Sequence, residues 1–227
     1  MPDFKGEQAI KYDERITRLV PGYELLHGLA AAQLKVLFPD EANILIVGAG
    51  TGKEVIELAK LNPTWSFIVQ DVSADMLAIA DQNFTNLGLS HRVKIQCGEL
   101  TSLIERVDCA LCLLVLHFIE DNGAKKMLLN QINSVLKPSA PLFLVDLMKP
   151  ETQFEREAQL VFCRTLGLTE IGLTRMRHNL EHEFHPLDRM RLSELLDECG
   201  FNAPHPFFKA LGFTGVSCNK RTGTNPQ

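Results

Sequence analysis

The chain of 227 residues has no apolar run of the roughly 18 residues that a membrane span requires, and its first seven residues contain no apolar segment of the kind that directs secretion. Its formal net charge of −5 gives no global electrostatic reason to bind nucleic acid, which leaves only a local basic patch as a route to such binding. These absences predict a cytoplasmic protein with no membrane partner. The hydrophobic share of 45% is enough to bury a core.

The six cysteines do not have the regular spacing of a disulfide framework, and several of them lie inside apolar runs. Cys109 and Cys112 form a C-x-x-C pair, which would suit zinc or a redox disulfide. However, they belong to the apolar run 107–115, which has the pattern of a buried strand, where residues three apart point to opposite faces. We therefore expect reduced thiols that pack in the core.

Short apolar runs alternate with amphipathic stretches between residues 43 and 147. Strands are expected at 44–47, 65–69, 93–96, 107–115 and 141–147, and helices at 53–61, 74–87 and 123–136. This alternation indicates βαβ units, a parallel sheet and right-handed crossovers. The sequence therefore predicts an α/β fold.

The flanking segments are expected to be helical, with a hairpin near the end. Residues 6–38 have the pattern of two helices interrupted at Val20-Pro21-Gly22. No repeat or low-complexity tract divides the chain, so we expect one domain over 1–227. Within it we expect four parts: an N-terminal helical lid (1–38), a core (43–147), a helical cap (151–186), and a helix ending at Gly200 followed by antiparallel strands that turn near Gly212 or Gly215 (187–220).

The strongest chemical signal is a glycine-rich turn, residues 48–52, directly after the first expected strand. Its pattern is G-x-G-x-G, so the third glycine comes one residue earlier than in a dinucleotide-binding turn, and the turn is one residue shorter than a phosphate-binding P-loop. Such a turn suits the amino-acid end of S-adenosylmethionine. A glycine turn without a ligand remains the alternative.

Asp71 gives the second signal, because it ends the apolar run 67–70 about 20 residues after the glycines. A carboxylate at the carboxyl end of the second strand can accept hydrogen bonds from both hydroxyls of a ribose. Asp71 could instead cap the next helix, although Ser73 is placed to do so.

In these motifs, together with residues 96–100 and Leu136-Lys137-Pro138, the chain resembles the class I S-adenosylmethionine-dependent methyltransferases. The resemblance implies a Rossmann-like, mostly parallel sheet of seven strands with helices on both faces, an N-terminal helical lid and a helical insertion after strand 5. It also implies S-adenosylmethionine as the cofactor, bound by Tyr12, Gly48, Ala49, Gly50, Gly52, Asp71, Val72, Met76, Gly98, Glu99, Leu100, Leu114 and His117. Two positions depart from the family: Ile46 stands where an acid is usual, and Glu99 where an aspartate is commoner.

A closer resemblance, to the carboxy-S-adenosylmethionine synthases of tRNA wobble-uridine modification and their relatives, covers almost the whole chain. It rests on residues 12–15, 20–23, 199–201 and 207–213. In those synthases an arginine five residues before the glycine of the 199–201 motif binds the added carboxylate, and here Leu195 stands in its place. Arg191 lies one helical turn earlier on the same face and keeps that activity open.

Substrate chemistry has few candidates. His117, after the fourth strand, could act as a general base, or it could simply pack beside Phe118. His178, His182 and His185 form the densest group of metal-ligand types, yet the family reaction needs no metal, so we expect none.

We therefore expect an enzyme that transfers a methyl group from S-adenosylmethionine to a small-molecule acceptor. The alternatives are methyl or carboxymethyl donor chemistry related to tRNA modification, and a non-catalytic module that binds S-adenosylmethionine or S-adenosylhomocysteine. The sequence also leaves a homodimer open.

Overall fold

The computed structural model describes residues 12–100 and 105–222. Seven strands form one sheet in the order β3-β2-β1-β4-β5-β7-β6. They are β1 (Asn43–Val47), β2 (Ser66–Asp71), β3 (Val93–Cys97), β4 (Cys109–Leu113), β5 (Pro141–Leu147), β6 (His205–Ala210) and β7 (Phe213–Asn219). Strands β1 to β5 are parallel, whereas β7 pairs antiparallel with both β5 and β6. The expected mostly parallel sheet of seven strands is confirmed.

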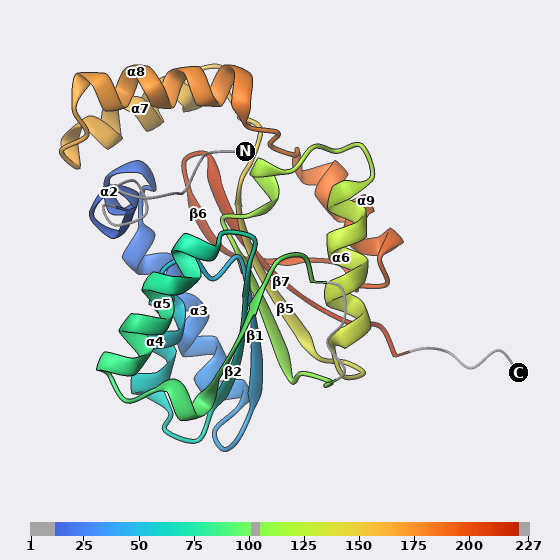
Figure 1. The fold of residues 1–227 in the computed structure, drawn as a ribbon. Helices are drawn as coiled ribbons and strands as arrows, with labels where there is room; N and C mark the ends of the chain where they lie inside the picture. The colour runs from blue at the N-terminus through green and yellow to red at the C-terminus, as the bar shows by residue number, and fades with distance from the viewer. Residues whose placement is uncertain (1–11, 101–104, 223–227) are drawn as a thin grey trace, which may run out of the picture.

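The helices follow the expected order along the chain (Figure 1). They are α2 (Tyr12–Leu19), α3 (Tyr23–Leu37), α4 (Lys53–Leu61), α5 (Ala74–Asn86), α6 (Ala124–Val135), α7 (Glu155–Thr165), α8 (Glu170–His178) and α9 (Arg189–Glu198), with short turns η1 (Ser90–Arg92), η2 (Leu116–Phe118) and η3 (Asn179–Glu183). The break between α2 and α3 falls where Pro21 and Gly22 predict it, and Gly22 has a φ of 73°. No helix among the described residues is long and apolar enough to cross a membrane.

The two faces of the sheet carry separate cores, because successive strand residues point to opposite sides. Ile44 and Cys109 pack with α3, α4 and α5 on one face, whereas Leu45 and Cys112 pack with α6 and α9 on the other. Figure 1 shows the two sets of helices on either side of the sheet. The C-x-x-C cysteines therefore point apart, as expected, and burial raises the pKa of both thiols.

The end of β4 and the turn of the C-terminal hairpin can be compared with the expected positions. The strand expected over 107–115 ends at Leu113, because Leu114 adopts a left-handed conformation with a φ of 61°. The C-terminal hairpin turns at Leu211 and Gly212, whereas Gly215 lies within β7 opposite Val145.

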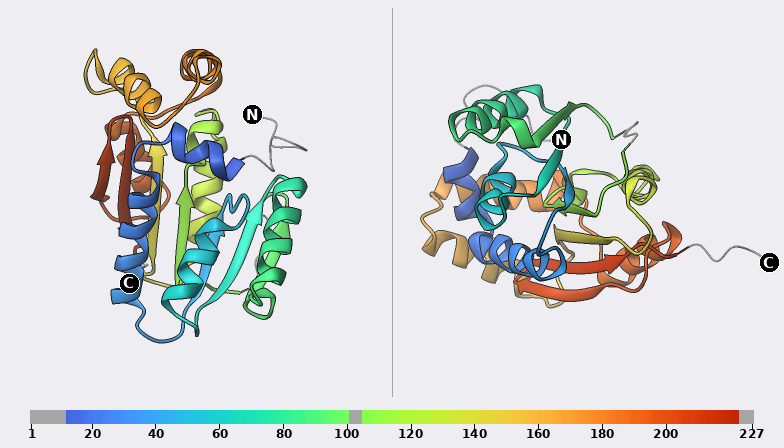
Figure 2. Two further views of the ribbon diagram at one scale, coloured as in Figure 1. Left: turned by 90° about the vertical axis from the view of Figure 1, so that its left-hand side faces the viewer. Right: turned by 90° about the horizontal axis from the view of Figure 1, so that it is seen from below.

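A cap of two helices, α7 and α8, follows β5 and lies beyond one end of the sheet (Figure 2). Five residues of the cap form a small core of their own: Leu160, Cys163, Leu168, Leu173 and Met176. Leu19, at the end of α2, packs against this core, so the N-terminal helix and the cap are in contact.

Candidate functional site

A cavity of about 770 Å³ lies at the carboxyl ends of β1, β2 and β4. Its lining residues come from the glycine turn, from the ends of β2 and β4, from α2, α3, the first residues of α4 and α5, and from α6. Strand β1 pairs with β2 on one side and β4 on the other, so the cavity lies where the strand order reverses. Open α/β sheets bind ligands at this point.

The glycine turn is held tightly against its neighbours. The backbone N–H groups of Gly48 and Ala49 both donate to the carbonyl oxygen of Gln70, at 2.8 and 2.9 Å. At Gly48 φ is 70°, and a Cβ atom would lie 2.4 Å from Cγ2 of Val115. Only glycine fits this position, since any side chain would collide with Val115 and strain the backbone.

Asp71 ends β2 and ties the turn to the next helix. One carboxylate oxygen accepts a hydrogen bond from the backbone N–H of Gly50 at 2.8 Å, and the other accepts one from the backbone N–H of Ser73 at 2.8 Å. Ser73 is the N-cap of α5, where its hydroxyl accepts from the N–H of Met76. Asp71 and Ser73 therefore both take part in capping α5, and Asp71 also lines the cavity.

The N-terminal helices form a second wall of the cavity, with Tyr12 and Tyr23 among its lining residues. The Thr51 hydroxyl donates to the carboxylate of Asp13 at 2.6 Å, which joins α2 directly to the glycine turn. Burial raises the pKa of both tyrosines well above the ordinary value, so their hydroxyls are neutral across the physiological range. The part of the expected lid before residue 12 lies outside the described residues.

Most of the residues expected to bind the cofactor line the cavity: Tyr12, Gly48, Ala49, Gly50, Asp71, Val72, Met76, Glu99, Leu100 and Leu114. Gly52, Gly98 and His117 do not. Gly52 lies beneath the turn, where a Cβ atom would come within 2.5 Å of the Phe84 ring. Gly98 donates its N–H to the carbonyl of Asp71 and thereby joins the ends of β2 and β3.

His117 is buried behind the cavity rather than exposed in it. Its Nδ1 lies 2.5 Å from the carboxylate of Asp146 on β5, and its ring packs against Phe118 and Phe184. Its backbone carbonyl accepts from the N–H of His185, so the residue fastens the segment after the cap to the sheet. This geometry favours the packing interpretation of His117 over the role of a general base.

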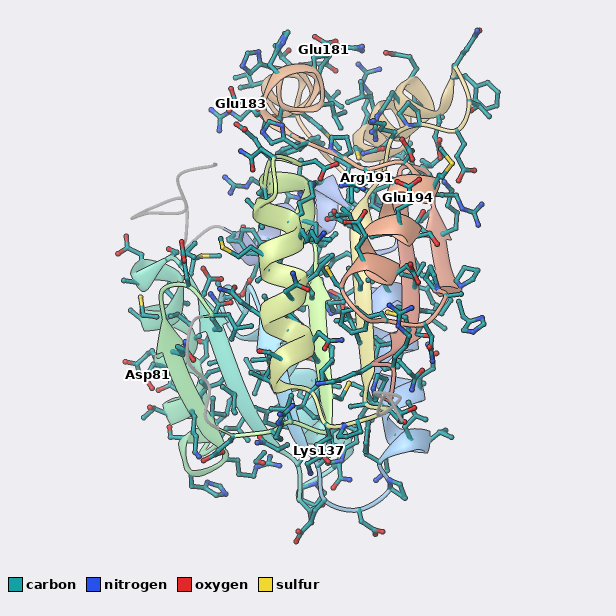
Figure 3. All side chains as sticks on the ribbon, turned by 90° about the vertical axis from the view of Figure 1, so that its right-hand side faces the viewer. Asp81, Lys137, Glu181, Glu183, Arg191 and Glu194 are labelled. Atoms are coloured by element: carbon teal, nitrogen blue, oxygen red, sulfur yellow. The ribbon has the colours of Figure 1, made fainter. Side chains whose placement is uncertain are left out.

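The other candidates lie outside the cavity. Arg191 on α9 (Figure 3) forms ion pairs with Glu194 and Glu198 of the same helix and with Asp121, which precedes α6, and Leu195 is fully buried.

No metal is expected at His178, His182 and His185, and two of these histidines, His178 and His182, are exposed. The rings of His178 and His182 lie 4.9 Å apart, and each histidine pairs with a nearby glutamate. Within residues 12–100 and 105–222, no group of three or more histidine, cysteine or acidic side chains is arranged to hold a metal ion.

Glu54, the second residue of α4, is a cavity-lining residue that the sequence did not single out. Its side chain is 13% exposed, and burial raises its pKa to about 7, an effect that the neighbouring Asp13 carboxylate increases. The adjacent Lys53 points its ammonium at Glu24, 2.7 Å away. Ile46, at the position where the family usually has an acid, is a core residue: it is 2% exposed and does not line the cavity.

Residues 44–139 match the family described as "Methyltransferase domain". Over most of its length the chain is similar to proteins named carboxy-S-adenosyl-L-methionine synthase. It is 27% identical to the one from Hydrogenovibrio crunogenus, over 92% of this chain and 86% of the relative, and 25% identical to the one from Ruthia magnifica subsp. Calyptogena magnifica, over 92% and 90%.

Solved structures of methyltransferases share the fold. The mitomycin 7-O-methyltransferase superposes with a TM-score of 0.65 at 18% identity, covering 86% of this chain and 53% of that one. Human N-acetylserotonin methyltransferase, solved in complex with S-adenosylmethionine, gives 0.67 at 16% identity, covering 96% and 58%. The chain thus spans a little over half the length of these two neighbours.

The sheet order, the cavity at the strand-order reversal and the glycine turn define a class I, Rossmann-like methyltransferase fold. Residues 44–139 carry the match to the methyltransferase-domain family, and relatives aligned over 92–94% of this chain are 21–27% identical to it.

Proposed function

We propose that this protein transfers a methyl group from S-adenosylmethionine to a small-molecule acceptor, with the donor bound in the cavity at the ends of β1, β2 and β4. The observation that carries the proposal is the convergence of the glycine turn and Asp71 on one cavity of about 770 Å³. That volume lies within the range of about 300–1,000 Å³ that small-molecule sites occupy.

The lining residues fit a nucleoside with a cationic amino-acid end. Gly48 and Gly50 hold the turn in left-handed conformations with φ of 70° and 54°, and a Cβ at Gly48 would meet Val115. Asp71 is placed to accept from ribose hydroxyls in addition to its two backbone bonds. Glu99 and Leu100, after β3, are assigned to the adenine, and Tyr12 to the methionyl portion.

When bound, S-adenosylmethionine supplies the electrophilic methyl carbon, so the protein mainly orients the donor and the acceptor. The buried tyrosines and the wall formed by α2 exclude water from the donor's amino-acid end. Since the His117 ring is engaged by Asp146 and does not line the cavity, we assign it a positioning role for η2. A nucleophile that needs no base from the protein fits this arrangement.

The names of the relatives raise a second candidate, synthesis of carboxy-S-adenosylmethionine. A carboxylate added to the donor would need a cation nearby, yet the only lysine or arginine among the described lining residues is Lys53, which pairs with Glu24. Arg191 is outside the cavity and pairs with three carboxylates, Asp121, Glu194 and Glu198. The cavity therefore favours the methyl donor over its carboxylated form.

Calorimetry with S-adenosylhomocysteine tests the donor site. We expect binding in the micromolar range, and Asp71→Ala should weaken it by about 1–3 kcal/mol because charge-assisted hydrogen bonds to the ribose are lost. Asp81→Ala is the matched control, since Asp81 is an exposed acid on α5 outside the cavity (Figure 3). Equal affinity in the Asp71 variant would remove this residue from the site.

Turnover separates an enzyme from a module that only binds the donor. Incubation with S-adenosylmethionine and a set of small acceptors bearing hydroxyl, amine or activated carbon nucleophiles should release S-adenosylhomocysteine with at least one of them. Tight binding of S-adenosylhomocysteine without release on any acceptor would favour the non-catalytic alternative.

A further inference from the structure

Glu54 is an acid that the fold places at the wall of the cavity without a cationic partner of its own. Among the described residues, no lysine or arginine lies within ion-pair distance of its carboxylate. The nearest basic group is Nε2 of His27, 3.9 Å from Oε1. Burial lowers the pKa of His27 to about 4, so this imidazole is neutral at physiological pH and does not compensate the charge.

The His27 ring, which does not line the cavity, leaves a polar atom unsatisfied beside Glu54. Its Nε2 atom is buried, has no hydrogen-bond partner and faces the Glu54 carboxyl. Unsatisfied buried polar atoms are rare in folded proteins and call for an explanation. His27 therefore neither donates to nor neutralises Glu54, which leaves the carboxylate free to bind a cationic group from the cavity.

Two further acids surround the same end of the cavity. Asp13 from α2 is held beside the glycine turn by its hydrogen bond with Thr51, and Asp71 lies at the end of β2. Both raise the pKa of Glu54 by electrostatic repulsion, so the three carboxylates lie close enough to share one electrostatic field. Tyr12 on α2 and Tyr23 on α3, which also line the cavity, are neutral.

We propose that Glu54 is the specificity-determining residue for the amino-acid end of the donor, where its carboxylate binds the α-ammonium group while Asp13 adds to the negative potential. This assignment rests on the proposed function. An ammonium group donates three hydrogen bonds, and its positive charge offsets the negative charge of the three acids. The residue thus selects a nucleoside with a charged amino-acid tail over one without it.

The test compares two ligands that differ at this end: S-adenosylhomocysteine, and 5′-methylthioadenosine, which lacks the amino-acid portion. Glu54→Gln keeps the shape of the side chain and removes its charge. It should weaken S-adenosylhomocysteine binding by on the order of 10- to 100-fold. The affinity for 5′-methylthioadenosine should stay within about twofold, since that ligand has no ammonium group to lose.

Glu57→Gln is the matched control, because Glu57 lies on the same helix and pairs with Lys60 outside the cavity. It should leave both affinities unchanged. If Glu54→Gln weakens both ligands equally, or neither, the assignment of Glu54 is overturned while the donor site stands. If the unchanged protein binds neither ligand, the proposed function fails and this inference fails with it.

The unchanged protein gives a second measurement that needs no variant. Raising the pH from 5.5 to 7.5 should strengthen S-adenosylhomocysteine binding relative to 5′-methylthioadenosine, because Glu54 must ionise to accept the ammonium group. The neutral His27, whose pKa lies near 4, does not titrate in this window. A ratio of affinities that is flat with pH would contradict the proposal.

Discussion

At the scale of single residues, Glu54 shows how a buried acid can reduce the stability of the folded protein. The pKa of this carboxyl is raised from its ordinary value of 4.5 to about 7, chiefly by burial. The folded protein therefore holds the proton more tightly than the unfolded chain does. The stability that this group contributes is present at low pH and is lost as the pH rises from about 4.5 through about 7.

Glu54→Gln should therefore raise the melting temperature of the ligand-free protein at pH 8, by on the order of 5 °C for a chain of this size. At pH 3.5 the two proteins should melt within about a degree of each other, because the glutamate is then almost wholly protonated in both states. Thermal unfolding followed by circular dichroism at the two pH values measures the difference. A gain of the same size at both pH values would show that charge is not its cause.

Which of the candidate residues line the cavity was predictable in part from the sequence. Gly48 and Asp71 were predicted because a glycine after a buried strand and an acid ending the next strand have few other uses. Gly52 has the same pattern but packs on Phe84, a contact between α4 and α5 that no local spacing reveals. Glu54 was missed because an acid in the first turn of a helix is ordinary.

At the scale of elements, α2 acts as a wall of the cavity through one polar contact. The Thr51 hydroxyl donates to Asp13 at 2.6 Å, while Ile16 and Val20 bury apolar surface in the main core. The apolar contacts hold the helix on the domain, and the hydrogen bond fixes its position against the glycine turn. Closure over the donor should therefore depend on the polar contact more than folding does.

Thr51→Val tests this role, because valine keeps the branched shape and removes the donor hydroxyl. We expect S-adenosylhomocysteine binding to weaken by about 10- to 100-fold, because a hydrogen bond to a charged group contributes about 1.5–3 kcal/mol. Thr17→Val, on α2 itself, is the control, since its hydroxyl bonds only to the carbonyl of Glu14. If the two variants bind the ligand equally well, the link between α2 and the turn has no part in donor binding.

The order of elements was predictable because parallel strands buried on both faces appear as apolar runs. Strand β5 occupies 141–147, as expected, whereas β4 ends two residues early. The early end follows from Leu114, whose N–H donates to the Val145 carbonyl from a left-handed conformation. A bend set by a neighbouring strand is a tertiary effect, so sequence pattern alone does not locate it.

At the scale of the whole molecule, the charge of the cavity and the charge of the donor are complementary. S-adenosylmethionine carries a sulfonium and an ammonium group, and the described lining of the cavity includes the acids Glu54, Asp71 and Glu99. The formal net charge of −5 adds a field of the same sign. Such a field attracts cations and raises their local concentration, an effect that salt weakens.

A donor whose methyl group carries a carboxylate would meet this field with an added negative charge. We therefore expect carboxy-S-adenosylmethionine to bind on the order of 10-fold more weakly than S-adenosylmethionine, since one uncompensated charge in a partly buried site costs about 1.4 kcal/mol or more. Competition of each compound against S-adenosylhomocysteine in calorimetry measures the difference. Mass spectrometry of ligands that copurify with the protein gives an independent measure of the same preference.

The outcome would place the protein relative to the synthases that it resembles along most of its length. Equal or tighter binding of the carboxylated donor would mean that a cation reaches the cavity, and Arg191 would then have to leave its ion pairs with Asp121, Glu194 and Glu198. Weaker binding would show that Leu195, fully buried on α9 where the synthases have an arginine, goes with use of the donor without the added carboxylate. The fold is shared in both cases, so the charges around the cavity decide which donor is used.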